Sequence, residues 1–284
     1  MSSFFHSLEE AFVSRFNVNI RRKLNGTSIV VPLINGVRVG VSGEKWMSGV
    51  LAEIFRYATS GIFYDVGVNL GQTLMKVMTL DEKRRYIGFE PNPSCVSYVQ
   101  RLVSLNHWER SITVIPVGLS DADELLYLHG DGETDPESSL IRDLHAQVNQ
   151  FSRIVPVFSH DSIMIRFLND RVSVVKIDVE GAELEVVRSL KSLIDRDRPI
   201  MVMEVLPNRQ EDQQKHLRNR EMIETVKSLG YSFYRIMKTS ADTYAGIAKV
   251  ENVGDYQDPV MKDHVILPVE QEAQILRLMT LVAL

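Results

Sequence analysis

The sequence predicts an α/β fold in which helices cover both faces of a mostly parallel sheet, and two observations support that prediction. From residue 61 onward, short apolar runs suited to strands alternate with longer segments whose apolar residues recur at helical spacing. The run Val172–Asp178 is apolar along most of its length, which is typical of a strand buried on both faces. A parallel sheet whose strands are joined by helices accounts for both patterns.

The elements of this sheet can be placed in chain order. The expected strands are Ile62–Val66, Tyr86–Glu90, Ile112–Leu119, Val172–Asp178, Ile200–Val205, Tyr231–Met237 and Tyr244–Val250, the last two as a hairpin. The expected helices are Gln72–Leu80, Ser94–Asn106, Ala182–Ile194 and Gln213–Leu229. A less regular part adds two strands and a short helix, at Glu124–His129, Val155–Phe158 and Asp161–Leu168, with Asp161 as the N-cap.

The first 60 residues are expected to form a small cap beside a main domain of residues 61–284. Its expected elements are a helix at Phe4–Phe16, a hairpin turning at Asn25-Gly26, a third strand at Val37–Val41 and a helix at Trp46–Tyr57. At the other end of the chain, the apolar stretch Ile275–Leu284 suits either a docking helix or an oligomer contact. The oligomeric state is therefore left open.

Composition narrows the class of protein. The chain has 284 residues, a formal net charge of −5 and no basic stripe, so nucleic acid is not the expected partner. The single cysteine, Cys95, rules out an internal disulfide and fits a reducing compartment. No apolar run reaches the length of a membrane span, and Glu9 and Glu10 interrupt any secretory signal core. These features predict a cytoplasmic protein.

The segment Asp65-Val-Gly-Val-Asn-Leu-Gly71 has the layout of a nucleotide-binding turn between a strand and a helix. Its glycines allow positive φ and close approach of a ligand, and Asn69 tolerates the same conformation. The segment does not match the G-x-G-x-x-G pattern of dinucleotide sites. A carboxylate at Asp65 would repel a pyrophosphate but suits the ammonium and sulfonium of S-adenosylmethionine. The glycines alone are equally compatible with a turn that only closes a strand–helix corner.

Glu90 is the candidate ribose-binding residue. It ends the second expected strand, 25 positions after Asp65, near the spacing of about 20 typical of the acid that binds a ribose diol. A carboxylate can accept hydrogen bonds from both ribose hydroxyls. The alternative is an acid at a strand end that faces solvent.

Several further acids follow the later strands. Asp178 and Glu180 come at the carboxyl end of the central strand, where open α/β sheets bind ligands. They can steer a cationic cofactor, position an acceptor hydroxyl or bind a metal, whereas Glu183 is explained by its place in the first turn of a helix. Glu204 ends the next strand and either lines the acceptor side or is an ordinary edge acid. His160 is a candidate general base, with a plain loop histidine as the alternative.

Taken together, these motifs resemble the FkbM-type family of class I S-adenosylmethionine-dependent methyltransferases. The matching segments are Asp65–Gly71, Gly88–Pro93, Gly118–Asp121 and Lys176–Glu183, followed by Glu204, and they cover roughly residues 61 to 206 in the order of the family. Val68 stands where many members carry alanine.

This resemblance implies a Rossmann-like sheet of seven strands with an antiparallel last hairpin, in a methyltransferase domain of residues 61–284. It implies that S-adenosylmethionine is bound, with Glu90 on the ribose and the segment from Gly118 near the adenine. The implied cofactor-binding residues are Asp65, Gly67, Asn69, Gly71, Glu90, Pro91, Asn92, Gly118, Ser120, Asp121 and Asp178. The family is associated mostly with O-methylation of small molecules, sugars and polyketides, so a small-molecule or glycan acceptor is expected.

The expected mechanism is in-line displacement, in which an acceptor oxygen attacks the methyl group on the sulfonium. Alignment and exclusion of water supply much of the effect, and a base removes the proton of the hydroxyl. We expect Asp178 to be that base, with Glu180 as its helper or as a metal ligand and His160 as an alternative. If a divalent ion takes part, these carboxylates are its expected ligands. The competing hypotheses are a non-catalytic scaffold of the same fold and an NAD-dependent enzyme, which Asp65 and Asn69 disfavour.

Overall fold

The computed structural model describes residues 17–130, 140, 151–164, 170–205, 213–254, 256 and 258–283. The helix expected over Phe4–Phe16 lies outside these residues. Within the described ranges, none of the helices is both long enough and apolar enough to cross a lipid bilayer.

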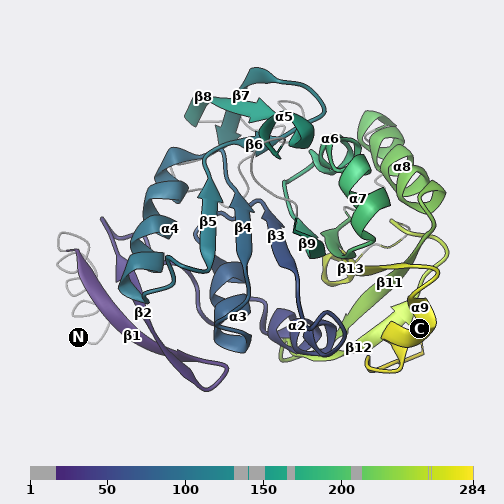
Figure 1. Cartoon of the computed structure of the whole chain (residues 1–284), viewed down its shortest axis with the longest axis horizontal. Helices are drawn as coiled ribbons and strands as arrows, with labels where there is room; N and C mark the ends of the chain where they lie inside the picture. Colours follow the sequence, from purple (N-terminus) through teal and green to yellow (C-terminus); the bar gives the residue numbers. More distant parts are fainter. Residues whose placement is uncertain are drawn as a thin grey trace.

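A mixed sheet forms the centre of the molecule and, among the described residues, contains eight strands in the order β12-β11-β13-β10-β9-β3-β4-β5 (Figure 1). Their bounds are β3 (Ile62–Val66), β4 (Tyr86–Phe89), β5 (Ile112–Ile115), β9 (Val172–Ile177), β10 (Ile200–Glu204), β11 (Tyr231–Lys238), β12 (Tyr244–Lys249) and β13 (Asp263–Pro268). The strands from β5 to β10 run parallel, and β11 and β12 form the expected antiparallel hairpin. The predicted Rossmann-like sheet is confirmed.

Strand β13 is the difference from the expected count of seven. It lies antiparallel between β10 and β11, pairing Met201 with Ile266 on one side and Phe233 with Ile266 on the other. All six of its residues are buried, which explains its place inside the sheet. The segment begins with Asp263 and His264, so its apolar run is short and carries no clear strand signal in the sequence.

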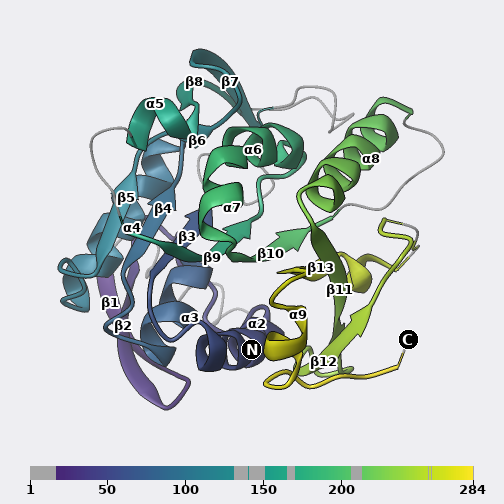
Figure 2. The ribbon, with the colours of Figure 1, turned by 45° about the vertical axis from the view of Figure 1, so that its right-hand side comes forward.

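Helices cover both faces of the sheet, and the alternation of side chains along each strand divides the core in two. The helices are α2 (Lys45–Tyr57), α3 (Gln72–Leu80), α4 (Pro93–Leu105), α5 (His160–Met164), α6 (Glu183–Ser189), α7 (Lys191–Asp197), α8 (Gln213–Ser228) and α9 (Glu272–Leu276). Phe63 packs into a core with α2, α3 and α4, whereas its neighbour Tyr64 packs into a second core with α6, α7 and α8. Figure 2 shows α6, α7 and α8 grouped on their own side of the sheet.

The hairpin expected near the N-terminus is confirmed as β1 (Val18–Leu24) and β2 (Thr27–Leu33). Asn25 and Gly26 turn it with φ of 49° and 83°, the left-handed conformation that a tight hairpin needs. The third strand expected at Val37–Val41 does not form. Within this segment, Val37 forms one isolated bridge with Ile34. The buried Val39 donates its N–H to the Tyr98 hydroxyl on α4 instead of to a neighbouring strand.

The described part of the predicted cap, residues 17–60, shares the core of the sheet. Residues of β2 and α2, such as Ile29 and Trp46, pack in one hydrophobic cluster with Leu74 of α3 and Tyr98 of α4. The boundary between a cap of residues 1–60 and a domain of residues 61–284 stays a prediction.

A second, three-stranded sheet holds β6 (Gly118–Leu119), β8 (Phe151–Phe158) and β7 (Glu124–Gly130). The single strand expected over Ile112–Leu119 is therefore two strands: β5 ends at Ile115 in the central sheet, and Gly118–Leu119 forms β6 in the small sheet. The short helix expected from Asp161 begins at His160, and Ser159 caps it, because the Ser159 Oγ accepts the N–H of Ser162. Residues 165–168 of that expected helix lie outside the described residues.

The single helix expected over Ala182–Ile194 is two helices, α6 and α7, that meet at the fully buried Leu190. The apolar C-terminal stretch docks on its own chain, where Leu281 bridges to Ile247 of β12. Thr280 is fixed by Glu53 of α2, whose carboxylate accepts bonds from the backbone N–H and the hydroxyl of Thr280 at 2.9 and 2.6 Å.

Candidate active site

A cavity of about 370 Å³ opens at the carboxyl ends of β3, β4, β9 and β10. Residues from the β3–α3 turn, from the end of β4 and from the β9–α6 loop line it, together with the first strand of the small sheet. This is the edge at which open α/β sheets bind ligands.

The β3–α3 turn has the predicted strand–turn–helix layout. Gly67, Asn69 and Gly71 have φ of 87°, 50° and 90°, so all three lie in the left-handed region. A Cβ on Gly67 would stand 1.9 Å from the carbonyl oxygen of Asp178, so the close passage of the chain after β9 requires a glycine there. Gly67 and Asn69 line the cavity, whereas Gly71 begins α3 behind the turn.

Glu90 lines the cavity, and its buried carboxylate is fixed by the backbone. Oε2 accepts the N–H of Asn69 at 2.7 Å and Oε1 accepts the N–H of Asn92 at 2.8 Å. Burial raises the pKa of Glu90 to about 7, although these two N–H groups oppose the shift. Pro91 and Asn92, also predicted for the site, line the cavity, and the Asn92 side chain caps α4.

Asp65 lies beneath the turn and does not line the cavity. It is fully buried, accepts the Tyr86 hydroxyl, and stands 3.5 Å from Lys176 Nζ. Burial raises the pKa of Asp65, and the Lys176 ammonium opposes that rise. Lys176 also donates to the carbonyl of Gly67 at 3.2 Å, so Asp65 supports the turn from below.

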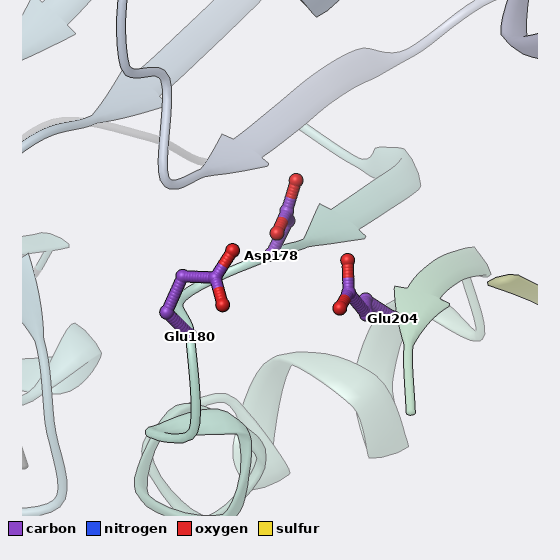
Figure 3. Close-up of side chains that lie close together, drawn as sticks. All are labelled: Asp178, Glu180 and Glu204. Atoms are coloured by element: carbon purple, nitrogen blue, oxygen red, sulfur yellow. The ribbon is translucent and has the colours of Figure 1, made fainter. Parts of the chain in front are cut away.

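Three of the carboxylates that line the cavity lie close together. Figure 3 shows Asp178 after the tip of β9, Glu180 on the following loop and Glu204 at the end of β10, with their carboxylates facing one another. One oxygen from each lies within 4.8 Å of the others. The backbone of Glu180 is in the left-handed conformation, with φ of 50°.

Asp178 and Glu204 differ in how readily their carboxyl groups ionise. Burial opposes ionisation of Asp178, but the Lys176 ammonium, 3.0 Å from its Oδ2, together with the charges of Lys262 and Lys76, outweighs burial and lowers the pKa of Asp178. Burial, together with the charge of Asp178, raises the pKa of Glu204 to about 8, even though Lys262 lies 2.6 Å from Glu204 Oε2. Asp178 is therefore the more readily ionised of these two acids.

The remaining predicted site residues lie apart from the cavity, except Gly118, which lines it. Ser120 donates its backbone N–H to Phe158, and Asp121 forms an ion pair of 3.1 Å with Arg188. His160 is buried beside Tyr64, with its Nε2 3.4 Å from the tyrosine hydroxyl, and burial lowers its pKa.

Two charged residues that the sequence did not suggest also line the cavity. Glu44 precedes α2 with φ of 48° and pairs with Lys76 at 3.0 Å. Lys262 precedes β13 and reaches Glu204. No motif marks either residue, because each arrives at the cavity through an element far away in the chain.

The sheet order and the ligand edge define the class of protein: a Rossmann-like architecture of the class I methyltransferase type. The model of the methyltransferase FkbM domain family matches residues 65–233, more than half of the chain. The chain therefore belongs to this family, as its motifs predicted. A comparison with curated proteins finds no match.

Several solved structures are similar to this chain. Methyltransferase FkbM from Methylobacillus flagellatus KT is 14% identical with a TM-score of 0.45, and the match covers 73% of this chain and 43% of that one. This chain thus spans less than half the length of that protein. The O-methyltransferase from Bacillus cereus in complex with SAH is 9% identical with a TM-score of 0.47, covering 80% of each chain. Aeropyrum pernix fibrillarin with natively bound S-adenosyl-L-methionine is 14% identical with a TM-score of 0.41, covering 89% and 98%.

Proposed function

We propose that this chain transfers a methyl group from S-adenosylmethionine to a hydroxyl of a small molecule or sugar. The observation that carries the proposal is Glu90, a buried carboxylate that lines the cavity and is held in place by two backbone N–H groups. Each of its oxygens keeps a second lone pair, so the fixed carboxylate can still accept a bond from each hydroxyl of a ribose.

The charge of the cavity supports a cationic cofactor. Its lining carries more carboxylates than ammonium groups: Glu44, Glu90, Asp178, Glu180 and Glu204 against Lys176 and Lys262. We assign Glu90 to the ribose, Asp178 to the ammonium, and the backbone at Gly118 to the adenine. Gly67 and Asn69 would flank the cofactor, while Asp65 acts on the site through Lys176.

When bound, S-adenosylmethionine supplies a methyl group on a sulfonium, which an oxygen nucleophile can displace. The chain's own task is to align the acceptor and take its proton. Asp178 is ionised at neutral pH because Lys176 lowers its pKa, so it can accept a hydrogen bond from the acceptor hydroxyl. Glu180 lies beside it. His160 contacts Tyr64 and does not line the cavity, so we favour the carboxylates as proton acceptors.

Calorimetric titration with S-adenosylhomocysteine tests the cofactor assignment. Wild type should bind one molecule, and Glu90→Gln should bind about tenfold more weakly or worse, because the amide offers one acceptor oxygen in place of two. Glu224→Gln is the matched control, since Glu224 is an exposed acid on α8 that pairs with Arg220 at 2.8 Å.

Three outcomes separate the candidate functions. No binding by folded wild type would contradict the proposal, and binding of NADH in its place would favour a dehydrogenase. Saturable binding without methyl transfer to any of a panel of sugars, catechols and polyols would favour a scaffold. Binding followed by transfer to a hydroxyl would establish the activity.

A further inference from the structure

Glu204 carries a buried oxygen that its own chain leaves unused. The side chain is 8% exposed, and its Oε2 is bound by Lys262 at 2.6 Å. Its Oε1 is buried and has no hydrogen-bond partner among the described residues. Leaving a buried carboxylate oxygen without a partner is costly, so native proteins commonly satisfy such an oxygen with an ordered water or a bound ion.

This oxygen belongs to a group whose spacing suits one cation. Oxygens of Asp178, Glu180 and Glu204 lie within 4.8 Å of one another, and Figure 3 shows the three carboxylates facing a common point. Two oxygens on opposite sides of one Ca²⁺ are about 5 Å apart, and on opposite sides of one Mg²⁺ about 4 Å. The three side chains can therefore reach a single ion of either size with small rotations.

The charges around the cluster leave room for a dication. Lys176 lies between Asp65 and Asp178, at 3.5 and 3.0 Å, and Lys262 pairs with Glu204. Together with Glu180, this makes four carboxyl groups against two lysines, so one divalent ion would balance the formal charge of the fully ionised cluster. The lysines bind one oxygen each of Asp178 and Glu204, as outer partners that orient carboxylate ligands do.

We propose that Asp178, Glu180 and Glu204 bind one divalent cation that prefers oxygen ligands, such as Mg²⁺, Mn²⁺ or Ca²⁺. The site joins the loop after β9 to the end of β10, two elements that no local sequence motif connects. This inference does not depend on methyl transfer, because the ion can be titrated in the absence of cofactor and acceptor.

Titration of the full chain with Mn²⁺, after removal of metal by a chelator, tests the site. Electron paramagnetic resonance of free Mn²⁺ should show one saturable site per chain, and Mg²⁺ or Ca²⁺ should displace the ion. Glu204→Gln and Asp178→Asn should each weaken binding by about tenfold or more, because each removes one of three charged ligands. Glu224→Gln on α8 should bind as wild type does.

Absence of saturable binding by the folded wild type would overturn the proposal, and so would equal affinities for Glu204→Gln and Glu224→Gln. If Glu204→Gln fails to fold, Glu180→Gln carries the same expectation, since Glu180 lies on a half-buried loop rather than in the sheet. The calorimetric test with S-adenosylhomocysteine is separate, so a protein that binds cofactor and no Mn²⁺ contradicts this inference alone.

Discussion

Gly67 shows that a glycine in a nucleotide-binding turn can be required by the protein itself. The sequence suggests that it admits a ligand, but the structure adds the carbonyl oxygen of Asp178, which a Cβ would meet at 1.9 Å. The chain after β9 must pass this close because Asp178 N donates to Val66 O at 3.1 Å, extending the pairing of β3 with β9. The β3–α3 turn therefore packs directly against the loop that carries Asp178.

The substitution Gly67→Ala should therefore destabilise the protein more than a glycine-to-alanine change in a turn where the added Cβ meets no other atom. Gly26 is the matched control, because its φ of 83° is close to the 87° of Gly67 but nothing lies within 4 Å of its added Cβ. We expect Gly26→Ala to cost about 1 kcal/mol from backbone strain and Gly67→Ala about 2 kcal/mol more. Urea unfolding measures both, and equal losses would show that the contact with Asp178 does not matter.

Glu90 should make the stability of the fold depend on pH. Its pKa rises from 4.5 to about 7 in the folded protein because burial disfavours the ionised form. The folded state then holds a proton that the unfolded chain has released, so the free energy of unfolding falls as pH rises through this window. Relative to Glu90→Gln, wild type should lose on the order of 3 kcal/mol between pH 4.5 and 7.5. Urea unfolding with chelator present measures this, and curves that stay parallel would show that Glu90 titrates normally.

The elements that the sequence predicts well are those whose signals are local. Asn25-Gly26 marks its hairpin because both residues tolerate positive φ, and the apolar run ending at Asp178 marks a central strand because it is buried on both faces. Strand β13 is missed because its apolar run is short and follows two polar residues, Asp263 and His264. Because the sequence does not predict this strand, Lys262 at its entrance cannot be placed beside Glu204.

The site residues also divide into those that a local sequence pattern places and those that depend on tertiary contacts. The turn at Gly67 and the acid at Glu90 are placed by neighbours in sequence, and the structure finds both at the cavity. Asp65 and His160 are chosen for their chemistry, yet their side chains are turned into the core by the alternation of β3 and by packing against Tyr64. Whether a side chain at the end of a strand or helix points into the core or into the cavity depends on tertiary contacts, which the spacing of residues in the sequence does not encode.

The docking of the C-terminal stretch depends on one buried acid of α2. Glu53 accepts two bonds from Thr280 and one from the Tyr244 hydroxyl at 2.7 Å, so it joins α2, β12 and the last residues. Thr280→Val should cost about 1 kcal/mol, the value of one such bond, and should speed amide exchange in residues 277–283. Thr113→Val, at an exposed position of β5, is the control. Unchanged exchange would show that the backbone bond alone holds the stretch.

At the scale of the whole molecule, the described part of the predicted cap shares a hydrophobic core with the sheet. Within residues 17–60, nine buried apolar residues join the cluster that also contains α3, α4 and one face of the sheet: Ile29, Val31, Val39, Trp46, Met47, Val50, Leu51, Ile54 and Ala58. Burying one large apolar side chain contributes about 1.5–3 kcal/mol, and whole domains are stable by about 5–15 kcal/mol. The free energy gained by burying these nine side chains is therefore comparable to the net free energy of unfolding of a whole domain.

A chain of residues 61–284 should consequently fail to fold on its own, whereas residues 17–284 should fold. We expect the longer chain to unfold cooperatively in urea and to bind S-adenosylhomocysteine, because it keeps both cores and Glu44 at the cavity. The shorter chain would expose the faces of α3 and α4 that α2 and β2 cover, and should show no cooperative transition. A cooperative transition and native-like circular dichroism from residues 61–284 would contradict this expectation. That outcome would establish the boundary after residue 60 as a true domain border.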